Sequence, residues 1–335
     1  MNAMESRTLG RQSGITVSAL GLGCWAIGGE WQDVEGNALG WGAVDDAESV
    51  AAIHRALDLG VTFFDTADTY GAGHSERVLG RALAGRRDEV VVATKWGNRF
   101  DPDTRTLTGA DATPGYVRQA LTGSLARLGT DHIDLYQLHL SDAPLAQAAE
   151  LRDVCEELVT EGLIRGYAWS TDDPERAALF AEGPHCVAVQ HACNVLQDAP
   201  ELLDLCERRG LAGVNRSPLA MGLLTGKYGP GSRSSSGDIR ATPPVWLRWF
   251  GEGGVPAPEW MARVDAVRDV LTSDGRTLAQ GALGWLWARS PQTVPIPGFR
   301  TVAQVEENAG ALEHGPLRPE QLEEIDKLLS RESAA

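Results

Sequence analysis

Four side chains that can carry charge or exchange protons stand at the ends of three successive β-rich runs. Asp65 ends the run VTFFD and Tyr70 follows it within a short segment, while Lys95 ends VVVATK and His139 ends IDLYQLH. The parallel strands of a closed barrel end at one rim, where polar and ionisable groups serve function. If these runs are neighbouring strands, the four side chains meet on one arc of that rim.

This combination of residue types has a definite chemical use. A tyrosine hydroxyl has a reference pKa of about 10, and a nearby ammonium group, here Lys95, favours the phenolate and lowers that pKa. Asp65 would pair with Lys95, while His139 would hydrogen-bond the reacting oxygen. Taken singly, such a lysine is usually solvated and such a histidine is usually an ordinary loop residue. Together the four predict carbonyl reduction, with Tyr70 as the proton donor.

The elements that must position these residues alternate regularly along the chain. Helical patterns lie between the runs, such as one with Thr113 as N-cap and Pro114 at its first position, and one that begins at Asp45 or Asp46. Buried strands alternating with helices, with no interdomain linker, predict one α/β domain over residues 1–335, a (β/α)8 TIM barrel. The eight predicted strands are VSALGLG, VTFFDTA, VVVATK, IDLYQLH, GYAWST, CVAVQ, LAGVNRS and TVPIPG.

Several segments fall outside the barrel repeat. RTLGRQSGITVSALG predicts an N-terminal β-hairpin, and Pro319 to Leu329 predicts an extra C-terminal helix. Residues 25–44 and 218–258 are long connections that contain tryptophans, so we expect long loops over the C-terminal face, where such loops usually serve a site. The stretch GPGSRSSSGD could instead be a plain disordered tip.

The charge balance excludes several kinds of partner. A formal net charge of −16 and a pI near 4.9 oppose binding to a nucleic acid or to an anionic membrane. No apolar stretch reaches the roughly 18 residues of a membrane helix, and the segment MNAMESRTLG lacks the apolar core of a signal peptide. We therefore expect a cytoplasmic protein that binds a small molecule. The helix patterns do not determine its oligomeric state.

Two patterns that suggest other chemistry are rejected. His185, Cys186, His191 and Cys193 offer metal ligands within a short span, but the strand periodicity and the lack of a C-x-x-C motif favour buried side chains, so no metal is predicted. GLGCWA approximates the dinucleotide fingerprint G-x-G-x-x-G/A, yet a tryptophan-rich loop follows where a helix should begin.

Beyond these local patterns, the chain resembles the aldo-keto reductases over nearly its whole length. The motifs that carry the resemblance are FFDTADTYGAGHSE, VVVATKWG, DLYQLH, GYAWST, SPLAMGLLTGKYG and PIPGFRTVAQVEENAGAL. The resemblance implies a catalytic tetrad at Asp65, Tyr70, Lys95 and His139, whose order and spacing match the family. It also implies an extended nicotinamide cofactor across the mouth of the barrel.

The resemblance further assigns contacts to that cofactor. Its carboxamide would meet Ser170, Gln190 and Thr171, which stands where the family usually has asparagine. Arg300 favours NADPH, without excluding NADH, because a guanidinium matches a phosphate in an acidic chain with few other anchors. The remaining implied contacts are Gly23, Trp25, Asp65, Ser217, Leu219, Gly222, Lys227, Gly298, Phe299, Gln304 and Asn308.

Arg216 departs from the family, because many members have an aromatic residue there that stacks on the nicotinamide ring. A planar guanidinium can also stack. Its charge predicts weaker binding of the oxidised, positively charged nicotinamide, and therefore a preference for reduction. A contact between Arg216 and an anionic substrate is an equal alternative.

Aromatic residues on the expected C-terminal loops predict an apolar or sugar-stacking substrate pocket. They do not distinguish aryl aldehydes, sugar aldehydes and keto-glycosides. The predicted reaction is NADPH-dependent reduction of an aldehyde or ketone. The alternatives are an NAD(P)-dependent alcohol or sugar dehydrogenase and a cofactor-sensing regulatory subunit of a channel. The expected substrate contacts are Trp25, Trp31, Tyr70, Trp96, His139, Trp246 and Trp249.

Overall fold

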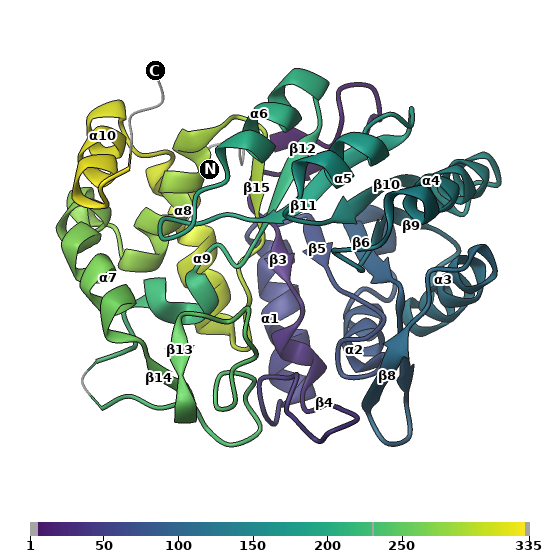
Figure 1. The fold of residues 1–335 in the computed structure, drawn as a ribbon, viewed down its shortest axis with the longest axis horizontal. Helices are drawn as coiled ribbons and strands as arrows, with labels where there is room; N and C mark the ends of the chain where they lie inside the picture. Colours follow the sequence, from purple (N-terminus) through teal and green to yellow (C-terminus); the bar gives the residue numbers. More distant parts are fainter. Residues whose placement is uncertain (1–5, 230, 332–335) are drawn as a thin grey trace.

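Eight parallel strands hydrogen-bond in chain order in the computed structural model, which describes residues 6–229 and 231–331. The last strand returns to the first, where Gly23 N donates to Pro297 O at 3.0 Å. This contact closes the sheet into the predicted (β/α)8 barrel (Figure 1). The strands are β3 (Leu22–Gly23), β5 (Phe63–Asp65), β6 (Val91–Trp96), β9 (Ile133–Leu138), β10 (Ile164–Ser170), β11 (Cys186–Ala192), β12 (Ala212–Arg216) and β15 (Thr293–Pro295).

The first barrel strand is shorter than predicted. Within VSALGLG only Leu22–Gly23 belongs to the barrel, because Val17 and Ser18 pair with the preceding arm of the hairpin instead. Each of the other seven predicted runs overlaps its strand. All residues of β6 and β9 are buried, as expected for parallel strands covered on both faces.

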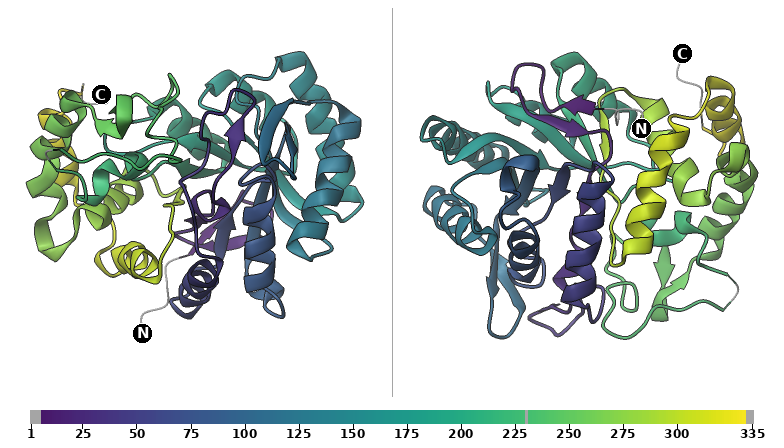
Figure 2. Two further views of the ribbon diagram at one scale, coloured as in Figure 1. Left: turned by 90° about the horizontal axis from the view of Figure 1, so that it is seen from below. Right: turned by 180° about the vertical axis from the view of Figure 1, so that it is seen from behind.

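Helices cover the outside of the barrel (Figures 1 and 2). They are α1 (Asp46–Asp58), α2 (His74–Ala82), η2 (Arg87–Glu89), α3 (Pro114–Leu128), α4 (Leu145–Thr160), α5 (Pro174–Phe180), α6 (Pro200–Arg209), α7 (Pro258–Leu271), η5 (Ser273–Gly275), α8 (Leu278–Arg289), α9 (Val302–His314) and α10 (Pro319–Leu328). As predicted, Thr113 caps α3 and α1 begins at Asp46. Asp45 caps α1 by accepting from Ala47 N at 2.8 Å. α9 packs beside α1, where the first and last repeats of the barrel meet (Figure 2, right).

The N-terminal hairpin closes one end of the barrel. Its strands β1 (Ser6–Thr8) and β2 (Thr16–Ser18) pair antiparallel, and Ser18 N donates to Thr62 Oγ1 just before β5. Leu9 and Ile15 in the connecting turn are fully buried and pack with side chains that fill the barrel interior, among them Phe63, Leu135 and Val214. The amino ends of the strands are therefore plugged, which leaves the carboxyl ends for a cavity.

The predicted C-terminal helix is present and ends one residue earlier than expected. Within this helix Ile325 is buried, whereas Leu328 is 44% exposed. No helix within the described part of the chain is long and apolar enough to cross a membrane.

The two long connections form ordered structure where they are described. They contain η1 (Ala26–Gly28) and β4 (Gln32–Asp33) in the first, and η3 (Ala220–Thr225), β13 (Phe250–Gly251), η4 (Glu252–Gly254) and β14 (Val255–Pro256) in the second. Ile239 N donates to Gly40 O at 2.8 Å, and Asp238 bridges Trp41, so the end of GPGSRSSSGD is held against the other loop. Pro230 in that stretch lies outside the described residues.

A hairpin that was not predicted follows β6. Its strands β7 (Asn98–Asp101) and β8 (Thr106–Ala110) form a three-stranded sheet with β4. Residues 98–110 show no alternation of buried and exposed side chains that would have indicated these strands. This small sheet adds a wall at the carboxyl ends of the strands.

We expect Ile15→Ala to lower the free energy of unfolding by about 2–5 kcal/mol, because the truncation opens a cavity in the barrel interior. Urea unfolding followed by circular dichroism measures this change. Leu328→Ala is the control, and its exposed side chain predicts a change of at most about 0.5 kcal/mol. Equal changes in the two variants would show that the hairpin does not plug the barrel.

Candidate active site

β5, β6 and β9 are neighbours in the barrel, and their carboxyl ends bring the predicted residues together. Asp65 is the last residue of β5, Lys95 lies opposite Gln137 in the register of β6 and β9, and His139 follows β9. Tyr70 lies in the loop before α2, where Ser75 N donates to its carbonyl oxygen at 3.1 Å. Strand register and the first turn of α2 therefore fix the arc.

The four side chains form one contact network. Lys95 Nζ donates to Asp65 Oδ2 at 2.5 Å, to Thr66 O at 2.8 Å and to Tyr70 Oη at 3.3 Å. The rings of His139 and Tyr70 meet edge to face, with 5.8 Å between their centroids. Lys95 is fully buried, whereas Tyr70 and His139 line a large cavity. The lysine therefore contacts the tyrosine from the protein interior.

Burial and charge set the protonation states of these groups. Burial raises the pKa of Tyr70, and this outweighs the lowering by Lys95 that the sequence predicted, so the net shift is upward and the hydroxyl stays protonated at neutral pH. Burial by itself would lower the pKa of Lys95, but attraction to Asp65 outweighs it and raises that pKa. Burial, and then the charges of Lys95 and Arg216, lower the pKa of His139 well below its usual value. The site thus holds a phenol, an ammonium and a neutral imidazole.

Gln137 is a part of this network that the sequence analysis missed. Its Nε2 donates to Asp65 Oδ1 at 2.8 Å, and Gln190 Nε2 donates to the same oxygen at 2.8 Å and to Gln137 Oε1 at 3.1 Å. Gln137 and His139 are two residues apart, so strand alternation places them on one face, and this signal was available in IDLYQLH. The two side-chain amides therefore donate to Asp65 Oδ1, the carboxylate oxygen that does not bond to Lys95.

A close backbone contact positions Tyr70 against the first long loop. Trp25 stacks on the Tyr70 ring, with 5.8 Å between centroids and 18° between planes, and Trp25 Nε1 donates to Leu39 O at 3.0 Å. Gly71 has φ +61°, and a Cβ added to it would lie 1.9 Å from Gly28 O. Only glycine at position 71 allows these two segments to approach so closely.

The network opens into a cavity of about 1070 Å³ at the carboxyl ends of the strands. Twenty of the predicted cofactor and substrate residues line it, namely Gly23, Trp25, Trp31, Asp65, Tyr70, His139, Ser170, Thr171, Gln190, Arg216, Ser217, Leu219, Gly222, Lys227, Trp246, Trp249, Gly298, Arg300, Gln304 and Asn308. The cavity is thus lined by residues of five barrel strands, β3, β5, β10, β11 and β12, and of both long loops.

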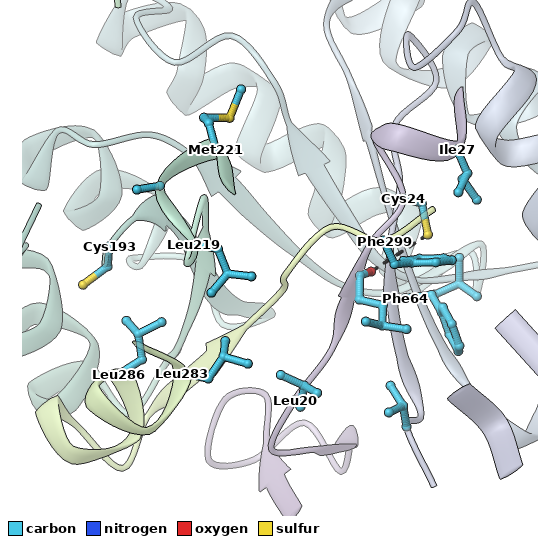
Figure 3. Close-up of a cluster of buried hydrophobic side chains, with 14 of the residues drawn as sticks. Leu20, Cys24, Ile27, Phe64, Cys193, Leu219, Met221, Leu283, Leu286 and Phe299 are labelled. Carbon is cyan, nitrogen blue, oxygen red and sulfur yellow. Dashed lines mark hydrogen bonds between the residues drawn. The ribbon is translucent and has the colours of Figure 1, made fainter. Parts of the chain in front are cut away.

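Two predicted contacts do not line the cavity. Trp96 is fully buried against Tyr136, because the preceding Lys95 faces the site and strand alternation turns Trp96 outward. Phe299 is buried in the hydrophobic core, where Figure 3 shows it beside Phe64 and Cys24. Substrate contact by the Trp96 side chain and cofactor contact by the Phe299 side chain are therefore wrong.

Cationic side chains gather in another part of the cavity. A Cβ added to Gly222 would lie 3.1 Å from Lys227 Nζ and 3.3 Å from Arg240 Nη1, so both cations pack over this glycine. Burial, and then the charge of Arg240, lower the pKa of Lys227 to about 8, and Arg300 adds to this effect. Such a group of crowded cations suits an anionic ligand.

Arg240, which the sequence analysis missed, also joins the two long loops. It is buried, pairs with Asp238, donates to Tyr228 Oη at 2.6 Å and lies 4.5 Å from the ring centroid of Trp41. Arg300 also contacts the first long loop, residues 25–44, because it donates to Trp41 O at 3.0 Å and to the carbonyl oxygen of Ala43. Arg240 lies in a polar loop, and its contact with Trp41 joins segments distant in the sequence, so no local signal revealed its role.

The histidines and cysteines weighed as metal ligands have other surroundings. His185 contacts Glu156, and His191 lies 3.3 Å from the amide of Asn215. Cys186 and Cys193 are buried free thiols. Across the described residues, no three histidine, cysteine or carboxylate side chains are placed to hold a metal ion.

Barrel closure, the hairpin plug and the Asp65, Tyr70, Lys95 and His139 arc together define a known class of protein. Residues 19–330 match the aldo/keto reductase family. The chain therefore belongs to this family of oxidoreductases, as its motifs suggested.

Curated relatives and solved structures agree with this assignment. The chain is 31% identical over 306 residues to an aldo-keto reductase yakc [NADP(+)] of Schizosaccharomyces pombe, covering 89% of this chain and 84% of the relative. It is 33% identical over 333 residues to a chloroplastic pyridoxal reductase of Arabidopsis thaliana, covering 92% and 82%.

Two solved structures show the same architecture. A glycerol dehydrogenase from Gluconobacter oxydans has a TM-score of 0.81 and 28% identity, with 100% of this chain and 98% of that chain covered. An aldo/keto reductase from Klebsiella pneumoniae in complex with NADP and acetate has a TM-score of 0.70 and 27% identity, with 99% and 97% covered.

We expect Gly71→Ala to lower both stability and turnover, because its Cβ would overlap Gly28 O and displace the adjoining Tyr70. Gly129→Ala is the matched control, since Gly129 has a similar φ of +67° but nothing within 4 Å of an added Cβ. The control should lose only about 1 kcal/mol of stability and keep its activity per folded molecule. Thermal unfolding and initial rates measure both effects; equal losses in the two variants would contradict the proposed close contact.

Proposed function

We propose that the protein reduces an aldehyde or ketone to the alcohol with NADPH, and that Tyr70 is the general acid. The observation that carries this proposal is the buried contact between Lys95 Nζ and Tyr70 Oη at the wall of the cavity, with Asp65 fixing the lysine. The bound cofactor would supply the hydride. All other steps belong to the side chains of this chain.

The protonation states suit proton donation to a developing alkoxide. Tyr70 enters the reaction as a phenol because burial raises its pKa, and the phenolate that it becomes is stabilised by the adjacent Lys95 ammonium. His139 is neutral, since its pKa is lowered, and its side chain lines the cavity. The imidazole can therefore hold the substrate oxygen by a hydrogen bond without adding a charge.

The cationic part of the cavity supports an assignment of NADPH. Lys227, Arg240 and Arg300 carry positive charge in a chain of net charge −16. Burial, and then the charge of Arg240, lower the pKa of Lys227, and a bound anion would oppose this lowering. Guanidinium groups bind phosphates through paired hydrogen bonds. Relatives with NADP in their names bind the same cofactor, and Ser170, Thr171 and Gln190 would hold its carboxamide.

The reverse reaction is the second candidate, because the glycerol dehydrogenase of Gluconobacter oxydans is similar over the full chain. The same tyrosine and lysine would then remove the proton of an alcohol. The walls of the cavity contain Trp25, Trp31, Trp246 and Trp249, which suit a flat or apolar substrate. Pyridoxal, the substrate in the name of one relative, belongs to the aromatic aldehydes.

We expect Tyr70→Phe to lower kcat by at least about a hundredfold, as for loss of a positioned general acid, while NADPH affinity stays within about twofold. Absorbance at the nicotinamide band reports turnover with NADPH and NADH over aryl aldehydes including pyridoxal, sugar aldehydes and α-keto aldehydes. Alcohols with NADP+ test the reverse direction. Turnover that persists in the variant would exclude Tyr70 as the proton donor.

We expect NADPH affinity to fall as pH rises above about 8, because Lys227 has a pKa of about 8 before an anion binds. A bound phosphate would raise this pKa, so affinity is level below pH 8 and decreases by up to about tenfold per pH unit above it. Lys227→Arg keeps its charge and should bind with no such decrease, while Lys227→Met should bind weakly at every pH. Calorimetric titration measures these constants, and a flat wild-type profile would exclude Lys227 from the phosphate site.

A further inference from the structure

An ion pair that joins three strand ends lies at the rim of the cavity. Arg216, the last residue of β12, donates through Nη2 to Asp172 Oδ2, and Asp172 follows β10. The other oxygen of the carboxylate accepts from Ala192 N, at the end of β11, at 2.7 Å. Each oxygen of the Asp172 carboxylate thus accepts a hydrogen bond. One bond comes from the backbone amide of Ala192, which fixes the Asp172 side chain, and the other comes from the Arg216 guanidinium.

The charge of Arg216 acts on the reaction centre. It lowers the pKa of His139 and opposes the rise in the pKa of Tyr70, and all three residues line the same cavity. The side chain of Arg216 is 32% exposed and that of Asp172 is 47% exposed. The pair is therefore open enough to meet a ligand, and solvent weakens its electrostatic effect without removing it.

We propose that Asp172 is a positioning residue that sets the orientation and the effective charge of Arg216, and thereby sets how strongly the protein prefers NADPH to NADP+. This inference rests on the proposed function, because it needs the nicotinamide ring near Arg216. The charge on Arg216 alone predicted a preference for the reduced cofactor. Asp172 places a compensating negative charge on that guanidinium and reduces this preference.

The two redox forms of the cofactor make a sensitive probe of this charge. NADP+ and NADPH share their phosphates, riboses and adenine, so those contacts cancel when the two dissociation constants are compared. Only the ring differs, because it is positively charged in NADP+ and neutral in NADPH. A change in the charge near the ring therefore changes the ratio of the two constants.

Asp172→Asn tests the proposal, because it removes the charge but keeps an oxygen that can accept from Ala192 N. We expect the ratio of the NADP+ to the NADPH dissociation constant to rise by about three- to tenfold over the wild type, through repulsion by Arg216 at an effective dielectric near that of a protein surface. Fluorescence or calorimetric titration at fixed pH and salt measures both constants without turnover. The same substitution in an Arg216→Gln background should change the ratio by less than about twofold, since Asp172 then acts only at long range.

Asp173→Asn is the matched control. It removes the same charge one residue away, at a side chain that pairs with Arg176 instead of Arg216, and asparagine keeps the N-cap of α5. We expect its ratio to stay within about twofold of the wild type. An unchanged ratio in Asp172→Asn, or an equal rise in Asp173→Asn, would overturn the role of Asp172. A wild type that binds neither form would instead overturn the proposed function.

Discussion

The buried ion pair between Lys95 and Asp65 is the interaction on which the site depends. A buried ammonium is unfavourable unless a partner charge and further hydrogen bonds compensate for the loss of water. Asp65 supplies the charge, and Thr66 O accepts a second hydrogen bond from the ammonium. Gln137 and Gln190 donate to the remaining carboxylate oxygen of Asp65. The third donor of the ammonium is then directed to Tyr70, at the wall of the cavity.

The two ends of the barrel are built for different tasks. At the amino ends of the strands, the hairpin seals the interior with apolar side chains such as Leu9 and Ile15. At the carboxyl ends, residues 25–44 and 218–258 meet through Gly40, Ile239 and Arg240, so that they enclose a cavity above the ion pair. Packing stabilises one end and leaves the other free to hold polar and charged groups.

Positive charge is concentrated in one part of the cavity, although the whole molecule is acidic. The chain is strongly acidic, yet Lys227, Arg240 and Arg300 gather at one part of the cavity, and Arg216 faces the reaction centre beside Asp172. Burial, and then the charge of Arg240, lower the pKa of Lys227, while Arg216 pairs with Asp172. The local arrangement of charges in the cavity therefore differs from the net charge of the molecule.

The sequence by itself determined the barrel, most of its strands and the arc of Asp65, Tyr70, Lys95 and His139, because apolar periodicity and strand ends are local properties. It did not reveal the β7–β8 hairpin, whose polar strands pair only at the rim. Trp96, by strand alternation, and Phe299, in the segment after β15, lie in the core against expectation. Strand alternation could have revealed Gln137. The raised pKa of Tyr70 and the partners of Arg216 and Arg240 were decided by the tertiary structure alone, because burial and contacts between distant segments exist only in the folded chain.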